Sequence, residues 1–320
     1  MDPVAVDDSL VPVVGPRDLG GTGVLVSPVS LDGASFGWAA GIDETLRVLD
    51  GYLAGGGNLI STADHYAGGR SEIMIGSWLR TVPDRMSVVL ETRVGRHPDA
   101  AGLGRLSLLR AVENSLTRLG TDYVDFLSFD GEDPDTPIEE SLETGYRLIS
   151  EGKVRFLSAS GFTGEAVREV ERLSDESGGP RFRALLAEYN LMERAFYERE
   201  LEDIAIEMQR GALARFPLAN GYLTGQFRTR DAEPGSIMYD DAIKHVGRRG
   251  DRVLAALDSV SKELQVPPSR VALAWVLLRP GVASAVLRAG DATQITDALE
   301  AVNVRLARHH VALLNRASEA

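Results

Sequence analysis

The regular alternation of short apolar runs with amphipathic windows constrains the fold of this chain more than any other feature. The windows at residues 42–54, 106–119 and 138–152 carry apolar side chains at three- and four-residue spacing, which is typical of helices that cover a core. Strand-like runs follow the first unit at residues 58–62, 87–93, 125–130, 156–160, 183–189, 211–216 and 284–287. Repeated strand–helix units favour a parallel sheet. We therefore predict an α/β fold, a (β/α)8 TIM barrel, with its site at the carboxyl ends of the strands.

Composition sets limits on the partners. The chain carries a formal net charge of −13, whereas nucleic acids and anionic membranes require clustered basic residues. We therefore expect a small-molecule substrate, with no nucleic acid and no membrane among the partners. The sequence has no Cys, which excludes disulfides, thiolate metal sites and cysteine nucleophiles. The first residues lack the basic and apolar regions of a signal peptide, so the predicted location is cytoplasmic.

The domain organisation is predicted from the same patterns. A length of 320 residues fits either one large barrel or two ordinary domains, and the repeated strand–helix units favour the barrel. We expect an N-terminal leader at residues 1–16 and a single (β/α)8 barrel domain with C-terminal helices at residues 17–320.

One segment carries a specific motif. Ser61-Thr62-Ala63-Asp64-His65-Tyr66 is followed by Gly68-Gly69-Arg70-Ser71-Glu72 and then by Ile75-Gly76. This order resembles the active-site loop of the aldo-keto reductases, D-T-A-x-x-Y-G-x-x-x-S-E-x-x-x-G. Other segments that resemble the family in order and spacing lie at residues 18–27, 115–125, 188–194, 216–225 and 272–277. The likeness covers roughly residues 17–303 and implies the barrel of this family.

The catalytic positions of that family are only partly kept. The resemblance implies a tetrad of Asp, Tyr, Lys and His, in which the tyrosine protonates the substrate carbonyl and the Lys lowers its pKa. Tyr66 is present, but Ser61 stands at the Asp position. Arg93 stands at the Lys position and Asp130 at the His position. Arginine is no simple replacement for lysine, because it is larger, forked and always protonated.

The positions that would hold NADPH in this family are altered too. The resemblance implies two side-chain amides that hold the nicotinamide and an aromatic ring that stacks on it, and the aromatic position falls at or beside Arg215. Asp32 adds a carboxylate near the place of the cofactor. The other altered cofactor positions hold Ser160, Gly161, Leu186, Arg288 and Ala298, while Gln294 is kept. These changes predict that NADPH and NADH bind weakly or not at all, and no cofactor is expected.

Each candidate role has a structural alternative. Tyr66 either transfers a proton or lines a pocket. Asp130 and Arg93 form either an acid/base pair or a structural ion pair. Glu91 lies two residues before Arg93, so both point into the barrel, where Glu91 is most simply the counter-ion of Arg93. His65 is either a proton shuttle or an incidental loop residue. The residues predicted to bind substrate are Ser61, His65, Asp32, Glu91, Arg215 and Trp38.

Two arginines also have two alternative roles. Arg215 and Arg288 either bind an anionic ligand or are solvated. No metal site is expected, because the His309-His310 pair lacks the carboxylate spacing of a metal site.

Three hypotheses follow for the function. In the leading one, the barrel has lost hydride transfer and performs cofactor-independent acid/base chemistry on a small metabolite, as in secondary metabolism. The reaction would be dehydration, elimination, isomerisation or cyclisation, with Tyr66 and Asp130 as proton-transfer groups and Arg93 stabilising negative charge. The first alternative is an NADPH-dependent aldo/keto reductase with an atypical Tyr/Arg/Asp site. The second is a non-catalytic binding or regulatory protein, since a fold alone does not establish a function.

Overall fold

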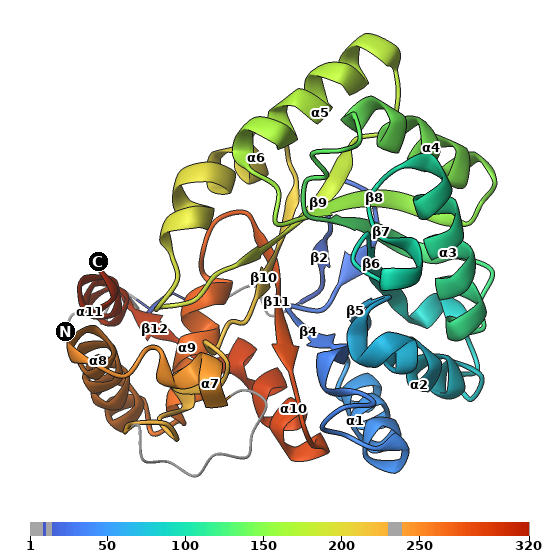
Figure 1. Cartoon of the computed structure of the whole chain (residues 1–320). Coiled ribbons are helices and arrows are strands. Elements are labelled where there is room, and N and C mark those ends of the chain that lie inside the picture. Colours follow the sequence, from blue (N-terminus) through green and yellow to red (C-terminus); the bar gives the residue numbers. More distant parts are fainter. Residues whose placement is uncertain (1–8, 11–14, 230–238, 320) are drawn as a thin grey trace, which may run out of the picture.

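The chain folds into a closed barrel of parallel strands surrounded by helices (Figure 1). The structure is a computed structural model that describes residues 9–10, 15–229 and 239–319. The barrel strands are β4 Val29–Asp32, β5 Leu59–Ala63, β6 Val89–Val94, β7 Val124–Asp130, β8 Val154–Ser160, β9 Phe182–Glu188, β10 Gly211–Arg215 and β11 Val282–Arg288. Their order around the barrel is β10-β11-β4-β5-β6-β7-β8-β9. The predicted TIM barrel is confirmed, and the bounds of the seven barrel strands predicted after the first one are shifted by at most two residues.

The helices form the outer layer, and the windows predicted at residues 42–54, 106–119 and 138–152 are confirmed as α1, α3 and α4. The helices in the described part of the chain are α1 Ile42–Ala54, α2 Arg70–Leu79, α3 Arg105–Leu119, α4 Ile138–Ser150, α5 Gly164–Ser177, α6 Glu202–Glu207, α7 Tyr239–Ile243, α8 Arg248–Leu264, α9 Pro268–Leu277, α10 Ala292–Leu299 and α11 Arg308–Ser318. The last helix packs beside α8 (Figure 1).

Two apolar cores hold these layers together. The larger core lies between the sheet and the helices, whereas the smaller one fills the inside of the barrel. The inner core includes Leu19, which lies in the hairpin between β2 Arg17–Asp18 and β3 Leu25–Val26 and contacts the start of β10 at Gly211. Because barrel strands alternate their side chains, the inward series on β6 runs from Val89 to charged groups at Glu91 and Arg93. The inside of the barrel therefore changes from apolar to charged toward its carboxyl end.

The predicted leader lies mostly outside the described residues. Its described part includes β1 Ser9–Leu10, which pairs antiparallel with β12 Leu306–Ala307 near the end of the chain. The division into a leader and one barrel domain stays a prediction.

Among the described residues, no helix is both long enough and apolar enough to cross a membrane. The predicted cytoplasmic location is not tested by this finding and stays a prediction.

A substitution of Gly76 on α2 tests how closely α2 packs against α3. A Cβ atom at this position would lie 2.4 Å from the carbonyl oxygen of Arg118 on α3, so Gly76→Ala should lower the free energy of unfolding by about 1–3 kcal/mol. Gly51→Ala is the matched control within a helix, because the nearest atom to its Cβ would be Ala292 Cβ at 3.8 Å. It should raise the stability by up to about 1 kcal/mol through helix propensity. Thermal melts of both variants measure this, and equal midpoints would contradict the packing.

Candidate functional site at the barrel mouth

Tyr66 is the centre of the candidate site. It begins a short 3₁₀ turn, Tyr66–Gly69, shortly after β5. Its Oη atom lies 2.5 Å from Nη2 of Arg93 and 3.2 Å from Nη2 of Arg215. Both guanidinium groups can only donate hydrogen bonds, so they occupy the lone pairs of the phenol oxygen and leave its own proton available. Burial raises the pKa of Tyr66, with Asp32 adding to the effect, while Arg93, Arg215 and Arg288 act in the opposite direction.

Arg93 is the most connected charged group of the site. Its side chain is fully buried, and Nη1 donates to Ser61 Oγ at 2.8 Å. It forms ion pairs with Glu91 at 3.4 Å and with Asp32 at 3.9 Å. Burial alone would lower the pKa of Arg93, but Tyr66 and the carboxylates outweigh burial and raise it, so the group is a permanent cation. The predicted pairing of Glu91 with Arg93 therefore matches the geometry.

Glu91 is held by a second contact as well. Ser61 Oγ donates to Glu91 Oε2 at 2.5 Å, so Ser61 links the carboxylate to Arg93. Burial raises the pKa of Glu91, and Arg93 opposes this shift. Ser61 thus takes part in the network as a neutral bridge.

Asp130 does not pair with Arg93, so this part of the expected constellation is wrong. Its carboxylate forms an ion pair with Arg96 at 3.2 Å and accepts a hydrogen bond from Ser160 at 2.9 Å. Asp130 still acts on Arg93 electrostatically, because it is one of the groups that raise the Arg93 pKa. The sequence patterns predicted no role for Arg96. This residue lies after the end of β6, where the alternation of side chains along the strand no longer applies.

Two further predicted residues lie in different surroundings. The His65 ring contacts the edge of the Tyr66 ring, with centroids 5.0 Å apart, and its Nδ1 atom lies 3.4 Å from Asp64 Oδ1. Asp64 is fully buried, neither of its oxygens accepts a hydrogen bond, and sequence reasoning assigned it no role. Trp38 is 64% exposed in the loop after β4, and its backbone N–H contacts Ser35. Its predicted part in substrate binding stays a prediction.

The positions expected for the nicotinamide carry no amide side chain. The Ser160 hydroxyl is engaged by Asp130. Gly161 adopts a left-handed backbone with φ 71°, which favours glycine. Leu186 belongs to the inner apolar core.

A pocket of about 550 Å³ lies beside the mouth and includes three of the other cofactor positions, Arg288, Gln294 and Ala298. Its walls come from residues 216–227, 267–273 and 287–298. Such a volume lies within the range of about 300–1,000 Å³ for ligand sites. These positions were expected to be vestigial, yet they line a space that a ligand can enter.

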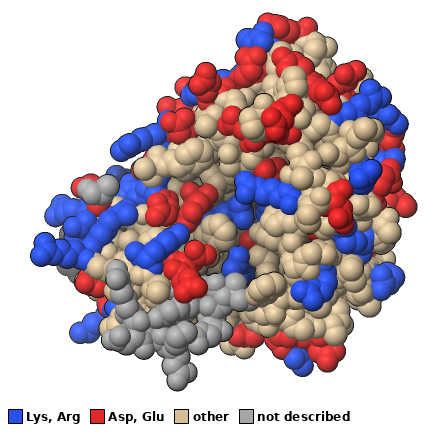
Figure 2. Space-filling model, viewed as in Figure 1, with Lys and Arg blue, Asp and Glu red and all other residues tan. Residues whose placement is uncertain are grey.

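Some charged groups of this pocket have partners within the protein, whereas the Nε–H of Arg288 has no acceptor. Asp291 caps α10 by accepting from the backbone N–H groups of Thr293 and Gln294, both at 2.9 Å. Asp297 pairs with Arg270 at 2.6 Å. Arg288 lies near the Phe216 ring, and its buried Nε–H has no acceptor. Figure 2 shows basic side chains inside a hollow in the middle of this face, with acidic side chains beside it.

Comparison with known proteins identifies the family. The sequence pattern of the Aldo/keto reductase family matches residues 33–319. The chain belongs to this family. It is 29% identical over 300 residues to a "Probable voltage-gated potassium channel subunit beta" of Arabidopsis thaliana, and the match covers 90% of this chain and 91% of that protein. The protein of the same name from Oryza sativa subsp. japonica is 28% identical over 300 residues, with the same coverage. The "Uncharacterized oxidoreductase YrpG" of Bacillus subtilis (strain 168) is 29% identical over 313 residues, with 93% of this chain and 94% of that protein covered.

The phenol oxygen of Tyr66 contacts a cation that two carboxylates hold. Nη2 of Arg93 donates to the Tyr66 oxygen, and both Glu91 and Asp32 lie beside Arg93.

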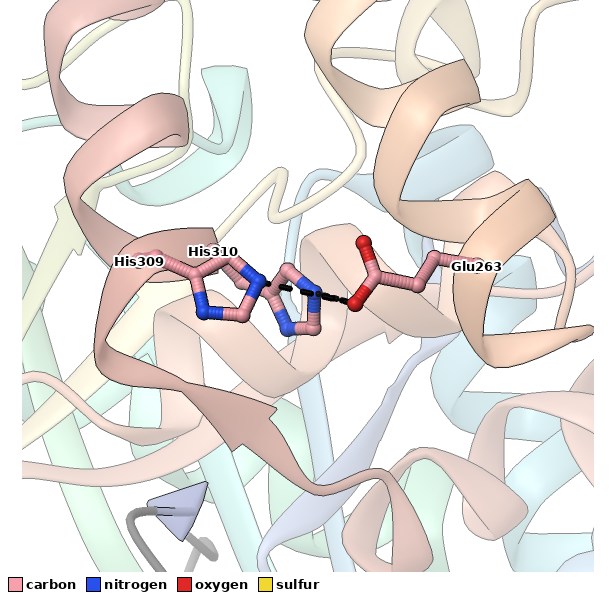
Figure 3. Close-up of side chains that lie close together, drawn as sticks. All are labelled: Glu263, His309 and His310. Carbon is pink, nitrogen blue, oxygen red and sulfur yellow. Dashed lines mark ion pairs between the residues drawn. The ribbon is translucent and has the colours of Figure 1, made fainter.

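A second cluster of ionisable residues lies away from the mouth (Figure 3). Glu263 of α8 faces His309 and His310 of α11, with Oε1 at 3.5 Å and 3.0 Å from their Nε2 atoms. The His310 Nδ1 atom accepts a hydrogen bond from the Ala307 N–H at 3.1 Å, so a neutral His310 carries its proton on Nε2, facing Glu263. A metal bound at this Nε2 would require that proton to move to Nδ1, where it would oppose the Ala307 N–H. We therefore interpret the cluster as a contact that joins α11 to α8, which sequence spacing alone could not reveal.

Arg93→Met tests the network around the phenol. The change leaves Glu91 and Asp32 without their cation, so it should lower the free energy of unfolding by about 3–5 kcal/mol. Arg96→Met is the matched control, because Arg96 is 59% exposed and its pair with Asp130 should contribute less than about 1 kcal/mol. Thermal and urea unfolding measure the difference. Adding Glu91→Gln to Arg93→Met should restore part of the lost free energy of unfolding. Similar stabilities for Arg93→Met and Arg96→Met would contradict the network.

Proposed function

We propose that this protein is an NADPH-dependent oxidoreductase that acts on a carbonyl group, with Tyr66 as the acid. The observation that carries the proposal is the donor-only surroundings of the Tyr66 oxygen. Arg93 and Arg215 both donate to it, so the phenol proton is free to move to a substrate oxygen, and the two cations stabilise the tyrosinate that is left. Arg93 takes the electrostatic part that lysine has in the family.

Several residues support the binding of a dinucleotide. Arg288 would hold phosphate groups, because its Nε–H is buried without an acceptor at the wall of the 550 Å³ pocket. The carboxylates of Asp291 and Asp297 are engaged by the α10 N-terminus and by Arg270, which reduces their repulsion of a phosphate. NADPH, when bound, supplies the hydride, which no amino-acid side chain can provide.

Cofactor-independent acid/base chemistry is the second candidate. It is favoured by the nicotinamide end of the site, where Gly161 and Leu186 offer no amide and Arg215 replaces an aromatic ring. The same Tyr66 proton would then serve an elimination or an isomerisation. Asp130 is less suited to the proton-transfer role predicted for it, because Arg96 and Ser160 already occupy its oxygens.

Binding of NADPH separates the two candidates. In a fluorescence titration, the wild-type protein should bind NADPH with a dissociation constant below about 100 μM, which corresponds to more than about 5 kcal/mol. Arg288→Gln should weaken this affinity about tenfold or more, because a charge-assisted contact to phosphate is lost. Arg47→Gln is the control, since Arg47 is 66% exposed and pairs with Glu44 on the outer helix α1. No signal up to about 1 mM NADPH would favour the acid/base candidate.

Tyr66→Phe tests the acid itself. With a panel of aldehydes and ketones, the turnover of NADPH should fall by about 100-fold or more, because loss of a general acid costs that much. The affinity for NADPH should change little, and the protein should stay folded with a loss of about 1–3 kcal/mol in its free energy of unfolding, because the buried Arg93 loses one acceptor. In parallel, ¹H NMR in D₂O without cofactor would detect deuterium exchange next to the carbonyl. Exchange that depends on Tyr66, in a protein that does not oxidise NADPH, would replace the oxidoreductase proposal by the second candidate.

A further inference from the structure

Arg215 has donor capacity that the protein does not use. It lies at the carboxyl end of β10, with its guanidinium carbon 4.8 Å from the centroid of the Phe216 ring. One Nη2–H points to Tyr66 Oη at 3.2 Å, while the Nε–H is buried and has no acceptor. A buried donor without a partner is rare in proteins unless a ligand or water completes it.

The described carboxylates around Arg215 act on it through their charge without contacting it in an ion pair. Glu188 lies opposite Arg215 in the register of β9 and β10, but the two form no ion pair within 4.0 Å among the described residues. Glu91 and Asp32 pair with Arg93. A cation that is partly buried beside the reacting phenol and lacks a paired anion is an electrostatic site for an anionic ligand.

We propose that Arg215 binds the carboxylate of a 2-oxo carboxylate substrate whose keto oxygen faces Tyr66. This inference rests on the proposed function, because it names the substrate class of the same site. The two donors, Tyr66 Oη and the Arg215 guanidinium, are in direct contact at 3.2 Å. The two ligand oxygens that accept hydrogen bonds from these donors must therefore lie close together as well. A carboxylate bonded directly to the carbonyl carbon meets this requirement, and the planar fork of arginine matches its two oxygens.

Arg288 lines a different space from Arg215, although its charge also acts on Tyr66. It lies at the wall of the 550 Å³ pocket, which residues 216–227, 267–273 and 287–298 line without Arg215. The guanidinium of Arg288 lies 5.8 Å from the centroid of the Phe216 ring, and that of Arg215 lies 4.8 Å from it. The two cations therefore share one aromatic support but belong to different spaces. We assign phosphate binding to Arg288 and carboxylate binding to Arg215.

The test compares charged and uncharged probes by direct binding, independently of turnover. Pyruvate, 2-oxobutyrate and phenylglyoxylate are each titrated into the whole chain beside their methyl esters, with and without NADPH, by calorimetry and ligand-observed NMR. At least one acid should bind wild-type protein tenfold or more tighter than its ester. Arg215→Gln should remove this preference and leave ester affinity within about twofold, while Arg215→Lys should keep part of it.

Arg288→Gln is the matched control, and it should weaken NADPH while leaving the acid preference unchanged. An acid preference that survives in Arg215→Gln overturns the proposal, and so does a wild-type protein that binds none of the acids more tightly than its ester. A wild-type protein that binds no NADPH but keeps an Arg215-dependent acid preference refutes the oxidoreductase function and supports the carboxylate subsite. Melting temperatures of the variants within a few degrees of wild type show that the fold is intact.

Discussion

The fully buried guanidinium of Arg93 is the interaction on which the mouth of this barrel depends. A cation in the interior is tolerated only when anions and acceptors surround it, because desolvation of an unpaired charge is costly. Glu91, Asp32, Ser61 and the Tyr66 oxygen supply those partners from three neighbouring strands and the loop that follows one of them. The position of the phenol is thereby tied to the charge balance inside the barrel, and structure and chemistry share the same contacts.

The side chain of Arg93 serves several partners at once. A lysine offers one compact charge, whereas the fork of arginine reaches several acceptors at once. In this chain Nη1 contacts Ser61 and Glu91, while Nη2 contacts Tyr66. The negative charge that faces Arg93 lies on β6, at Glu91, and at the end of β4, at Asp32.

The fold is predictable from the sequence because its signals are local and repeated. Apolar runs and helical periodicity identify the strands to within two residues, and alternation along β6 correctly pairs Glu91 with Arg93. The partner of Asp130 is not predictable in this way. Arg96 reaches Asp130 from beyond the end of β6, where the backbone leaves the strand geometry and period-two reasoning no longer applies. The pocket is not predictable from local patterns either, because its walls combine three separate segments of the chain, at residues 216–227, 267–273 and 287–298.

The apolar layer inside the barrel separates the charged mouth from the opposite end. Leu19, Val89 and Phe126 fill the interior beneath the charged layer, and hydrocarbon side chains offer no proton relay. In the proposed reduction, a tyrosinate at Tyr66 would recover its proton through the open end of the barrel. The His65 ring contacts the Tyr66 ring and is 30% exposed to solvent, and its Nδ1 atom lies 3.4 Å from Asp64 Oδ1. Under that proposal, substrate and protons would both reach the phenol from the mouth.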